Sequence, residues 1–534
     1  MKKRKIVPLL LCCIMIFSSA GCQSASKTPY DQIIVYSIPD EPDSLDPQIA
    51  ETSSEQLIVM NIFEGLVRQD TDGSIIPGMA ENWTVSDDQT VYTFTLRQEI
   101  CWCNGDSVTA DDCRYGIERA LNPDTGSKSA DALYAIKNAE AVRKGKLPLS
   151  SLGVYTSDNR IIFVLAYPDP DFLLSLTSSA AMPCQKAFFT ASGGQYGREA
   201  DKLLSNGPFY IRSSDWTHGD RVCLRRNPYY HGIHKPIPAG VSITVGQSPA
   251  NVCQSIAEGS IDCYRLPVGE LAQARQNHLR LTAFGETVWG ISFNCRHETL
   301  KYEEIRHALL SSLNRSFILQ NVPESCTAAE NIIPDTARIN GVSYRSQVSE
   351  SLSIPYSDTA KQDLQTAMKK VSVTHLPKLT ILCSDDEGTQ TIVNNIIQSW
   401  NELTGHYVNK IPVSAAELND KILSGEYEVV IAPLTPENNR PESILSAFTS
   451  DSRYNTAQLT DSYYDGLISK IRSSSAPQVL SKIIQAEKYL SDKGIFYPLY
   501  TETCYYVTAE NVSGIIFRPR HQGIDFFFAQ KIPE

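Results

Sequence analysis

A regular alternation of apolar strands and amphipathic helices between residues 379 and 434 constrains the fold more than any other feature. LTILCS (379–384) reads as a short apolar strand, and the following TIVNNIIQSWNELTG places its apolar side chains on one helical face and ends at Gly405. The strand YVNKIPVS, a helix that ends at Gly425 and the run YEVVIAPL (427–434) complete the unit. That last run is typical of a strand buried on both faces.

The β-α-β-α-β order predicts a mainly parallel, wound sheet with helices on its faces. Ligands of such sheets bind beyond the carboxyl ends of the strands, which indicates the residues just after Ile431. The first half of the chain differs, because QTVYTFTLR (89–97) alternates large side chains with threonine and RIIFVLAY (160–167) follows a turn as another strand. These segments predict a mixed α+β lobe. Two unlike lobes with a site between them are the usual anatomy of a closing clamp.

The first 22 residues have the organisation of an export signal that ends in a modified cysteine. MKKRK is basic, Ile6 to Phe17 are almost all apolar, and small residues precede Cys22. The apolar core is too short to span a bilayer. This order resembles the lipobox of bacterial lipoproteins, which implies a signal peptide (1–21), lipidation of Cys22 and a tether (22–32) on the extracellular face of the cell membrane. An ordinary signal peptide with an incidental cysteine, or a buried apolar helix, is the alternative.

Composition limits the partners. The chain has 534 residues, enough for two or three domains, and a formal net charge of −12, which disfavours nucleic acid and anionic lipid. Most of its 14 cysteines are spread singly, which is not the pattern of a disulfide framework. Neither the Cys101/Cys103 pair nor HGIH (231–234) has the spacing of a convincing metal site. We therefore expect no metal and no cofactor, and cysteines that act mostly as small buried side chains.

Several stretches, in order from residue 33 to the C-terminus, resemble the oligopeptide-binding extracellular solute-binding proteins (family 5) of ABC importers, in their lipoprotein form. They are SLDPQ (44–48), IFEGLV (62–67), the segment from GMAENW to YGIERAL (78–121), SNGPFYI with LRRNPYY (205–230), FN with EIRHALLSSLNR (293–315) and AEKYLSDKGIFYPLY (486–500).

The resemblance implies an α/β fold, a two-lobed periplasmic-binding-protein-like clamp (class II) with an additional inserted α+β lobe. Lobe I would comprise residues 33–63, 184–286 and 502–534, the inserted lobe residues 64–183, and lobe III residues 287–501. It also implies a monomeric Gram-positive receptor, not an enzyme, that binds a peptide between two lobes and delivers it to ABC transporter permease and ATPase subunits.

The resemblance also indicates where the peptide ammonium would bind. Burying that charge requires a carboxylate within salt-bridge reach. Family members supply an aspartate a few residues after the strand that reads YEVVIA here, and the aligned residue in this chain is Glu437. A solvated loop glutamate is the alternative. The tryptophan that many members place shortly before this acid is absent, with Leu434 and Thr435 in its place.

Five further residues stand at family positions near the ligand. Glu51 and Ser53 lie in the loop after SLDPQ, Asn206 opens an Asn-Gly turn, and Trp289 and Tyr500 occupy positions rich in aromatic residues. The alternatives are ordinary surface residues, a turn asparagine and core aromatic side chains, respectively.

Other functions stay open at this point. Relatives of this fold bind dipeptides, signalling peptides, metal chelates or oligosaccharides, and some isolated copies act as sensors without a transporter. An exported hydrolase would need a catalytic constellation, and the sequence contains no P-loop, H-E-x-x-H or G-x-S-x-G motif. A third class of function, besides a binding protein and a hydrolase, is a purely structural lipoprotein of the cell surface.

Overall fold

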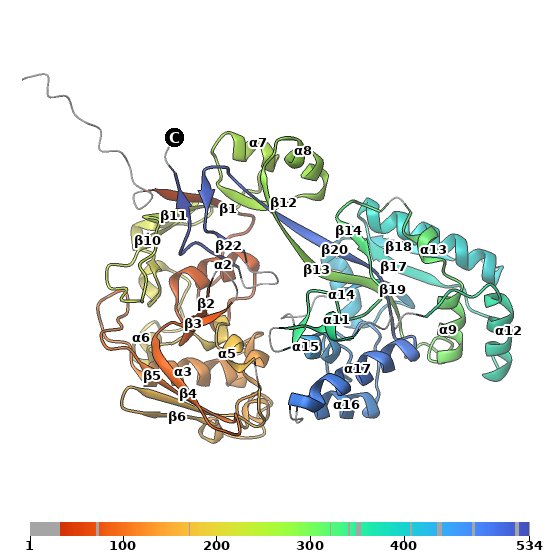
Figure 1. Ribbon diagram of the computed structural model, residues 1–534, viewed down its shortest axis with the longest axis horizontal. Coiled ribbons are helices and arrows are strands. Elements are labelled where there is room, and N and C mark those ends of the chain that lie inside the picture. The colour runs from red at the N-terminus through yellow and green to blue at the C-terminus, as the bar shows by residue number, and fades with distance from the viewer. Residues whose placement is uncertain are drawn as a thin grey trace, which may run out of the picture.

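The computed structural model describes residues 32–70, 74–169, 171–320, 322–339, 342–348, 354–405, 408–434, 440–472, 476–517 and 523–532. Figure 1 shows two bodies joined by two long strands, β13 (Arg280–Phe293) and β20 (Phe496–Thr508). The predicted signal peptide, Cys22, the tether and Glu437 lie outside the described residues. The two-lobed clamp predicted from the sequence is confirmed, whereas the exact lobe boundaries stay a prediction.

One body contains lobe I and the inserted lobe, each with its own sheet. The lobe I sheet consists of β1 (Ile33–Ile38), β11 (Gly240–Val245), β10 (Arg221–Arg226) and β8 (Phe209–Tyr210), with β9 (Trp216–Thr217) on β10. The inserted sheet is antiparallel in the order β4 (Ala80–Val85), β5 (Val91–Leu96), β7 (Arg160–Val164) and β6 (Val154–Ser157). The strands predicted around residues 89–97 and 160–167 are therefore confirmed as β5 and β7.

This body also contains helices and short strand ladders. They are α2 (Ser53–Ile62), α3 (Ala110–Leu121), α4 (Ala139–Arg143), α5 (Phe172–Ser175), α6 (Lys186–Ala191), α7 (Val252–Ala257), α8 (Leu271–Gln276), β2 (Val67–Gln69), β3 (Ile75–Pro77), β21 (Val512–Ser513), β22 (Ile516–Phe517), β23 (Ile524–Asp525) and β24 (Gln530–Lys531).

A seven-stranded sheet extends from lobe I into lobe III. Its order is β12 (Cys263–Leu266), β20, β13, β19 (Val429–Leu434), β17 (Thr380–Ser384) and β18 (Asn409–Val413), with β14 (Cys326–Ala328) also on β20. The main helices are α9 (Glu303–Ser311), α10 (Arg315–Ile318), α12 (Ala360–Lys370), α13 (Glu387–Thr404), α14 (Ala415–Ser424), α15 (Pro441–Ser446), α16 (Ser462–Arg472) and α17 (Ala476–Asp492).

The predicted β-α-β-α-β unit is confirmed, because β17 pairs in parallel with both β18 and β19. The prediction of a mainly parallel sheet is wrong for the sheet as a whole. β19 pairs with β13, and β13 with β20, in antiparallel fashion. The reason is that the strands which complete the sheet come from the two crossings between the bodies, far from the unit in sequence.

Helices α13 and α14 fix the two faces of this unit. Asp386 caps α13 by accepting a hydrogen bond from the Thr389 amide at 2.8 Å, and the helix ends at Gly405 with a left-handed φ of 70°. Its buried side chains include Ile392 and Trp400, and burial of each large apolar side chain contributes roughly 1.5–3 kcal/mol. On the opposite face, α14 packs Leu418 and Ile422 against β17 and β19. The carboxyl ends of β17 and β19 are thereby held at one edge of lobe III.

Two further properties of the described chain concern membrane-spanning helices and cysteine or metal sites. No helix among the described residues is long and apolar enough to cross a membrane. Eleven cysteines of the described chain are free, six of them buried, and no cluster of metal-ligating side chains occurs in that part of the chain.

A buried ion pair joins lobe I to the inserted lobe. Arg119 of α3 donates to both carboxylate oxygens of Asp46, at 3.0 and 2.6 Å, and to Gln48 Oε1 at 2.6 Å. Its guanidinium also lies 3.8 Å from the centre of the Phe189 ring. Only 8% of the Arg119 side chain and 4% of the Asp46 side chain are exposed. The two family-like stretches SLDPQ and YGIERAL therefore meet as an internal strut.

Arg119→Met tests this strut. We expect the free energy of unfolding to fall by about 3–5 kcal/mol, because Asp46 would stay buried without its cation. Urea denaturation followed by circular dichroism measures the loss. Arg114→Met is the matched control, since Arg114 lies on the same helix, is 41% exposed and pairs only with neighbouring surface acids; its cost is about 1 kcal/mol or less. Equal losses for the two variants would contradict the strut.

Candidate functional site

Two of the predicted site residues meet on the ribbon formed by β13 and β20. Trp289 and Tyr500 stand opposite each other in the ladder, with ring centres 6.1 Å apart and planes within 10° of parallel. The indole Nε1 of Trp289 donates to Glu502 Oε2 at 2.9 Å. The Tyr500 hydroxyl lies 3.3 Å from Thr389 Oγ1 at the start of α13. These contacts fix both rings. Tyr500 is 4% exposed and packs in the core of lobe III, so the half-buried Trp289 is the ring of the pair that can face a ligand.

The aromatic pair lies at the edge where the wound unit presents its strand ends. Trp289 pairs with Pro433, one residue before the end of β19. Thr389, which contacts Tyr500, lies in the first turn of α13, directly after the end of β17. The site predicted beyond the carboxyl ends of the strands therefore has the aromatic pair beside it.

The electrostatics at this edge are acidic. Burial raises the pKa of Tyr500 well above its usual range, and the nearby Cys326, Asp386 and Glu502 raise it further, against a lowering by the Thr389 hydrogen bond. The phenol therefore stays neutral and can donate. Glu502 is half-buried and carries a second carboxylate oxygen besides the one held by Trp289. This arrangement favours a cationic group in a bound ligand.

Glu502 was missed from the sequence. It stands between two threonines in the run IFYPLYTETCYYV, where it is the one charged residue. A lone carboxylate in an apolar strand is a signal that could have been used, because strands of this kind bury charge only with a partner.

Glu51 and Ser53 lie in the other body, at the start of α2, and both are exposed. Their loop is organised by Glu55, whose carboxylate accepts hydrogen bonds from the amides of Glu51 at 2.8 Å, Thr52 at 3.0 Å, Asp43 at 3.1 Å and Ser44 at 3.2 Å. The Glu51 carboxylate pairs with Lys128 of the inserted lobe. The structure thus holds these two residues apart from the Trp289–Tyr500 pair, on the lobe I side.

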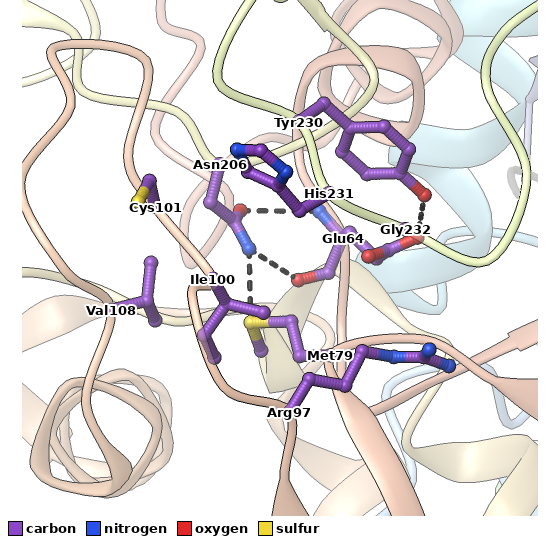
Figure 2. Close-up of a pocket in the computed structure, with 10 residues that line it drawn as sticks. All are labelled: Glu64, Met79, Arg97, Ile100, Cys101, Val108, Asn206, Tyr230, His231 and Gly232. Atoms are coloured by element: carbon purple, nitrogen blue, oxygen red, sulfur yellow. Dashed lines mark hydrogen bonds between the residues drawn. The ribbon is translucent and has the colours of Figure 1, made fainter.

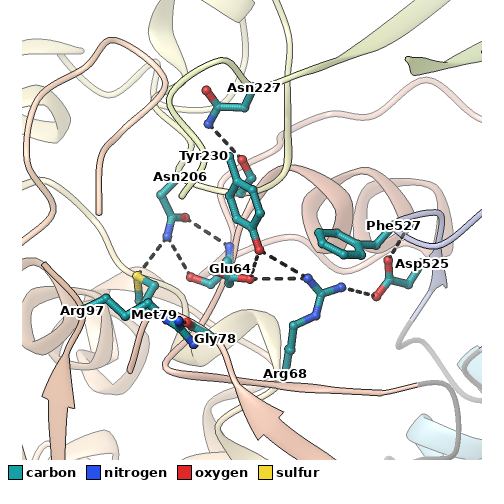
Figure 3. Close-up of polar contacts among 11 residues, drawn as sticks. Glu64, Arg68, Gly78, Met79, Arg97, Asn206, Asn227, Tyr230, Asp525 and Phe527 are labelled. Carbon is teal, nitrogen blue, oxygen red and sulfur yellow. Dashed lines mark hydrogen bonds and ion pairs between the residues drawn. The ribbon is translucent and has the colours of Figure 1, made fainter. Parts of the chain in front are cut away.

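Asn206 is buried and binds the backbone of Glu64 (Figures 2 and 3). Its Oδ1 accepts from the Glu64 amide at 3.2 Å, and its Nδ2 donates to the Glu64 carbonyl at 2.8 Å and lies 3.0 Å from Met79 Sδ. Both ends of the side-chain amide are used inside the protein. The side-chain amide of Asn206 thus has a structural role, and a ligand contact by this residue stays a prediction.

Glu64 belongs to a buried polar network that joins four segments of the chain (Figure 3). Its carboxylate accepts from the Tyr230 hydroxyl at 2.5 Å and from Arg68 at 3.4 Å. Arg68 also donates to Asp525 at 3.1 Å and lies 3.9 Å over the ring of Phe527. Burial raises the pKa of Glu64, with Arg68 and Tyr230 acting in the opposite direction. The network is a second strut between lobe I, the inserted lobe and the C-terminal segment.

A small cavity adjoins this network (Figure 2). Its volume is about 10 Å³, and its lining includes Glu64, Arg97, Asn206 and His231. That volume is near the minimum for one water molecule, so the cavity cannot receive a peptide.

Comparison with known proteins identifies the family that shares this chain's pattern. Residues 74–456 match the model described as bacterial extracellular solute-binding proteins, family 5 middle. The dipeptide-binding protein DppE of Bacillus subtilis is 25% identical over 503 residues, covering 93% of this chain and 92% of DppE. The oligopeptide-binding protein OppA of the same organism is 26% identical over 548 residues, covering 97% of each chain. Listeria monocytogenes OppA bound to peptide superposes with a TM-score of 0.76 at 22% identity, covering 94% of this chain and 100% of that one.

Asn206→Ala distinguishes the structural role from a ligand contact. We expect the free energy of unfolding to fall by about 1–3 kcal/mol, because the buried amide and carbonyl of Glu64 would lose their partner. Chemical denaturation measures the change. Asn104→Ala is the control, since Asn104 is exposed and bonds only within its own turn; its effect should stay within about 0.5 kcal/mol. An Asn206 variant as stable as this control would refute the structural role.

Proposed function

This chain belongs to family 5 of the bacterial extracellular solute-binding proteins, and we propose that it is a receptor that binds peptides between its two lobes and delivers them to an ABC transporter. The relatives named above include a dipeptide-binding and an oligopeptide-binding protein, and one solved neighbour contains a peptide. Dipeptides are the nearest alternative cargo. Signalling peptides, metal chelates and oligosaccharides are the other cargoes that the sequence leaves open.

The observation that carries the proposal is the rigid, acid-bordered aromatic pair on the ribbon between the bodies. Trp289, half-buried and stacked on the buried Tyr500, offers flat apolar area, while Glu502 offers a carboxylate beside it. A peptide has both an ammonium and apolar side chains, so one such edge can bind both parts. Glu437, in the stretch that follows β19, is the proposed main partner of the ammonium; as a glutamate it reaches one methylene farther than the aspartate of relatives.

Closure would come from bending of the β13–β20 ribbon. The ladder shifts register between Gly285 and Thr287, opposite Glu502 and Thr503. Such irregularities weaken the ladder locally and increase its twist, which makes them suitable hinge points. The proposed lobe boundaries, after residues 286 and 501, coincide with this place.

The cellular setting completes the proposal. A lipid-anchored protein on the outer face of a Gram-positive membrane stays near its permease without an outer membrane to retain it, and Cys22 would carry the acyl chains. We propose a monomer without enzymatic activity, because the struts and the aromatic edge account for the polar groups described above without a nucleophile and a positioned base. Turnover of a peptide by purified protein would overturn the non-enzymatic part.

Thermal unfolding of residues 23–534 with and without alanine peptides of two to five residues tests the ammonium anchor. We expect peptides with a free N-terminus to raise Tm, since ligand at 100 times its Kd stabilises the native state by about 2.7 kcal/mol. N-acetylation of the peptide or Glu437→Gln should abolish the shift, whereas Glu417→Gln, an exposed position on α14, should preserve it. Equal shifts from free and acetylated peptides would contradict the anchor.

Tryptophan fluorescence tests whether the aromatic pair forms the ligand wall. We expect a peptide that stabilises the protein to change the emission of the wild type, because the half-buried indole of Trp289 senses solvent and charge at this edge. Trp289→Phe keeps an aromatic ring against Tyr500 and should abolish the change. Trp216→Phe is the control, because Trp216 lies in lobe I and bonds to Glu41. A full change in the Trp289 variant would remove this residue from the ligand site.

A further inference from the structure

One direct contact between the inserted lobe and lobe III is centred on an arginine. Arg440, the residue before α15, donates from Nε to Asp171 Oδ2 at 3.0 Å and pairs through Nη2 with Asp169. The two aspartates lie just before α5 in the inserted lobe. Figure 1 shows α5 and α15 facing each other where the two bodies approach. The contact therefore spans the two bodies and lies away from the β13–β20 ribbon.

This contact is well enclosed for an ion pair between bodies. The exposed fraction is 20% for Arg440, 24% for Asp171 and 5% for Asp169. Asp169 is also held by its own lobe, since its Oδ1 accepts from the Asp171 amide at 3.0 Å and its carbonyl accepts from the Tyr92 hydroxyl at 3.3 Å. The acidic half is thus organised on the inserted lobe before the arginine arrives. An ion pair of this enclosure is worth more than an exposed surface pair.

A second, exposed contact joins the same bodies. Lys144 Nζ lies 3.2 Å from Asp451 Oδ2 of lobe III and 2.8 Å from Glu140 Oε1 of its own helix. Exposed pairs contribute little on their own. Its place between the same two lobes shows that the inserted lobe and lobe III meet over more than one residue.

The inserted lobe cannot follow lobe III when the clamp opens. The Arg119–Asp46 pair and the Arg68–Asp525 pair fix it to lobe I. Bending at the ribbon must therefore pull Arg440 away from Asp171 and Asp169. Opening would leave two aspartates beside each other without this cation, which disfavours the open arrangement.

We propose that the inserted lobe works as a latch, in which Asp169 and Asp171 bind Arg440 and bias the ligand-free protein toward the closed arrangement. This goes beyond the proposed function, because it assigns a role to the inserted lobe that does not depend on which solute is bound. The latch adds to the closing free energy from the ligand and therefore slows release of any solute held between the lobes.

Small-angle X-ray scattering of residues 23–534 tests the latch, after unfolding and refolding have removed any bound ligand. The method needs no thiol-reactive label, which the eleven free cysteines would make unspecific. We expect Arg440→Gln to raise the radius of gyration, with a shift of the open-to-closed ratio by about tenfold, the equivalent of one hydrogen bond between charged groups. Arg453→Gln removes the same charge from lobe III, at an exposed position, and should leave the scattering curve unchanged.

Asp171→Asn and the double variant Arg440→Gln/Asp171→Asn complete a double-mutant cycle. If the residues act as a pair, the Asp171 change should raise the radius of gyration in the wild type and add little in the Arg440→Gln background. Arg440→Lys keeps the charge without the two-pronged geometry and should give an intermediate value, which also covers failure of the Gln variant to fold. The latch would be overturned if the Arg440→Gln and Arg440→Lys variants had the radius of gyration of the wild type. It would also be overturned if the changes in the double-mutant cycle were fully additive. Neither result bears on peptide binding, which the Tm shifts of the previous subsection measure separately.

Discussion

The β13–β20 ribbon is the constraint on which the rest of the molecule depends. The chain passes between the two bodies in these two antiparallel strands, so each relative motion of the bodies must bend or twist the ribbon. The ribbon also carries Trp289, Tyr500 and Glu502 beside its irregular stretch. A motion that closes the clamp therefore acts at the place where the aromatic pair stands.

Both bodies combine an apolar core with buried polar pairs. Lobe III relies on apolar helices against its sheet, such as α13 with Trp400. Lobe I and the inserted lobe share one continuous apolar core and are also joined by buried polar struts, the pair of Arg119 with Asp46 and the network around Glu64. Polar struts fix geometry closely, because each group must find its partner or lose the free energy of hydration. This stiffness lets the inserted lobe present Asp169 to lobe III as part of one rigid body.

Local patterns predicted local structure well. The periodicity of residues 379–434 predicted β17, α13, β18, α14 and β19 with their order and parallel pairing. This was possible because the apolar face of a helix and the length of a strand depend on residues that are close in sequence. The mixed character of the sheet was not predicted, because β13 and β20 are distant in sequence and nothing local says that they pair. Trp289 and Tyr500 lie opposite each other on the ribbon, a neighbourhood that the resemblance did not predict, and their contact with a ligand stays a prediction. The same holds for Asn206, whose side-chain amide is bonded to the backbone of Glu64. Arg440 and Asp169, 271 positions apart, could not be paired from the sequence at all.

The central claim is that the space between the lobes receives a peptide. Native mass spectrometry of the refolded protein, mixed with equal amounts of peptides, oligosaccharides and a ferric chelate, tests that claim most directly. The account predicts a single added mass per protein molecule, drawn from the peptides, that persists as an intact complex. An added mass from a sugar or a chelate, with every peptide left free, would contradict it.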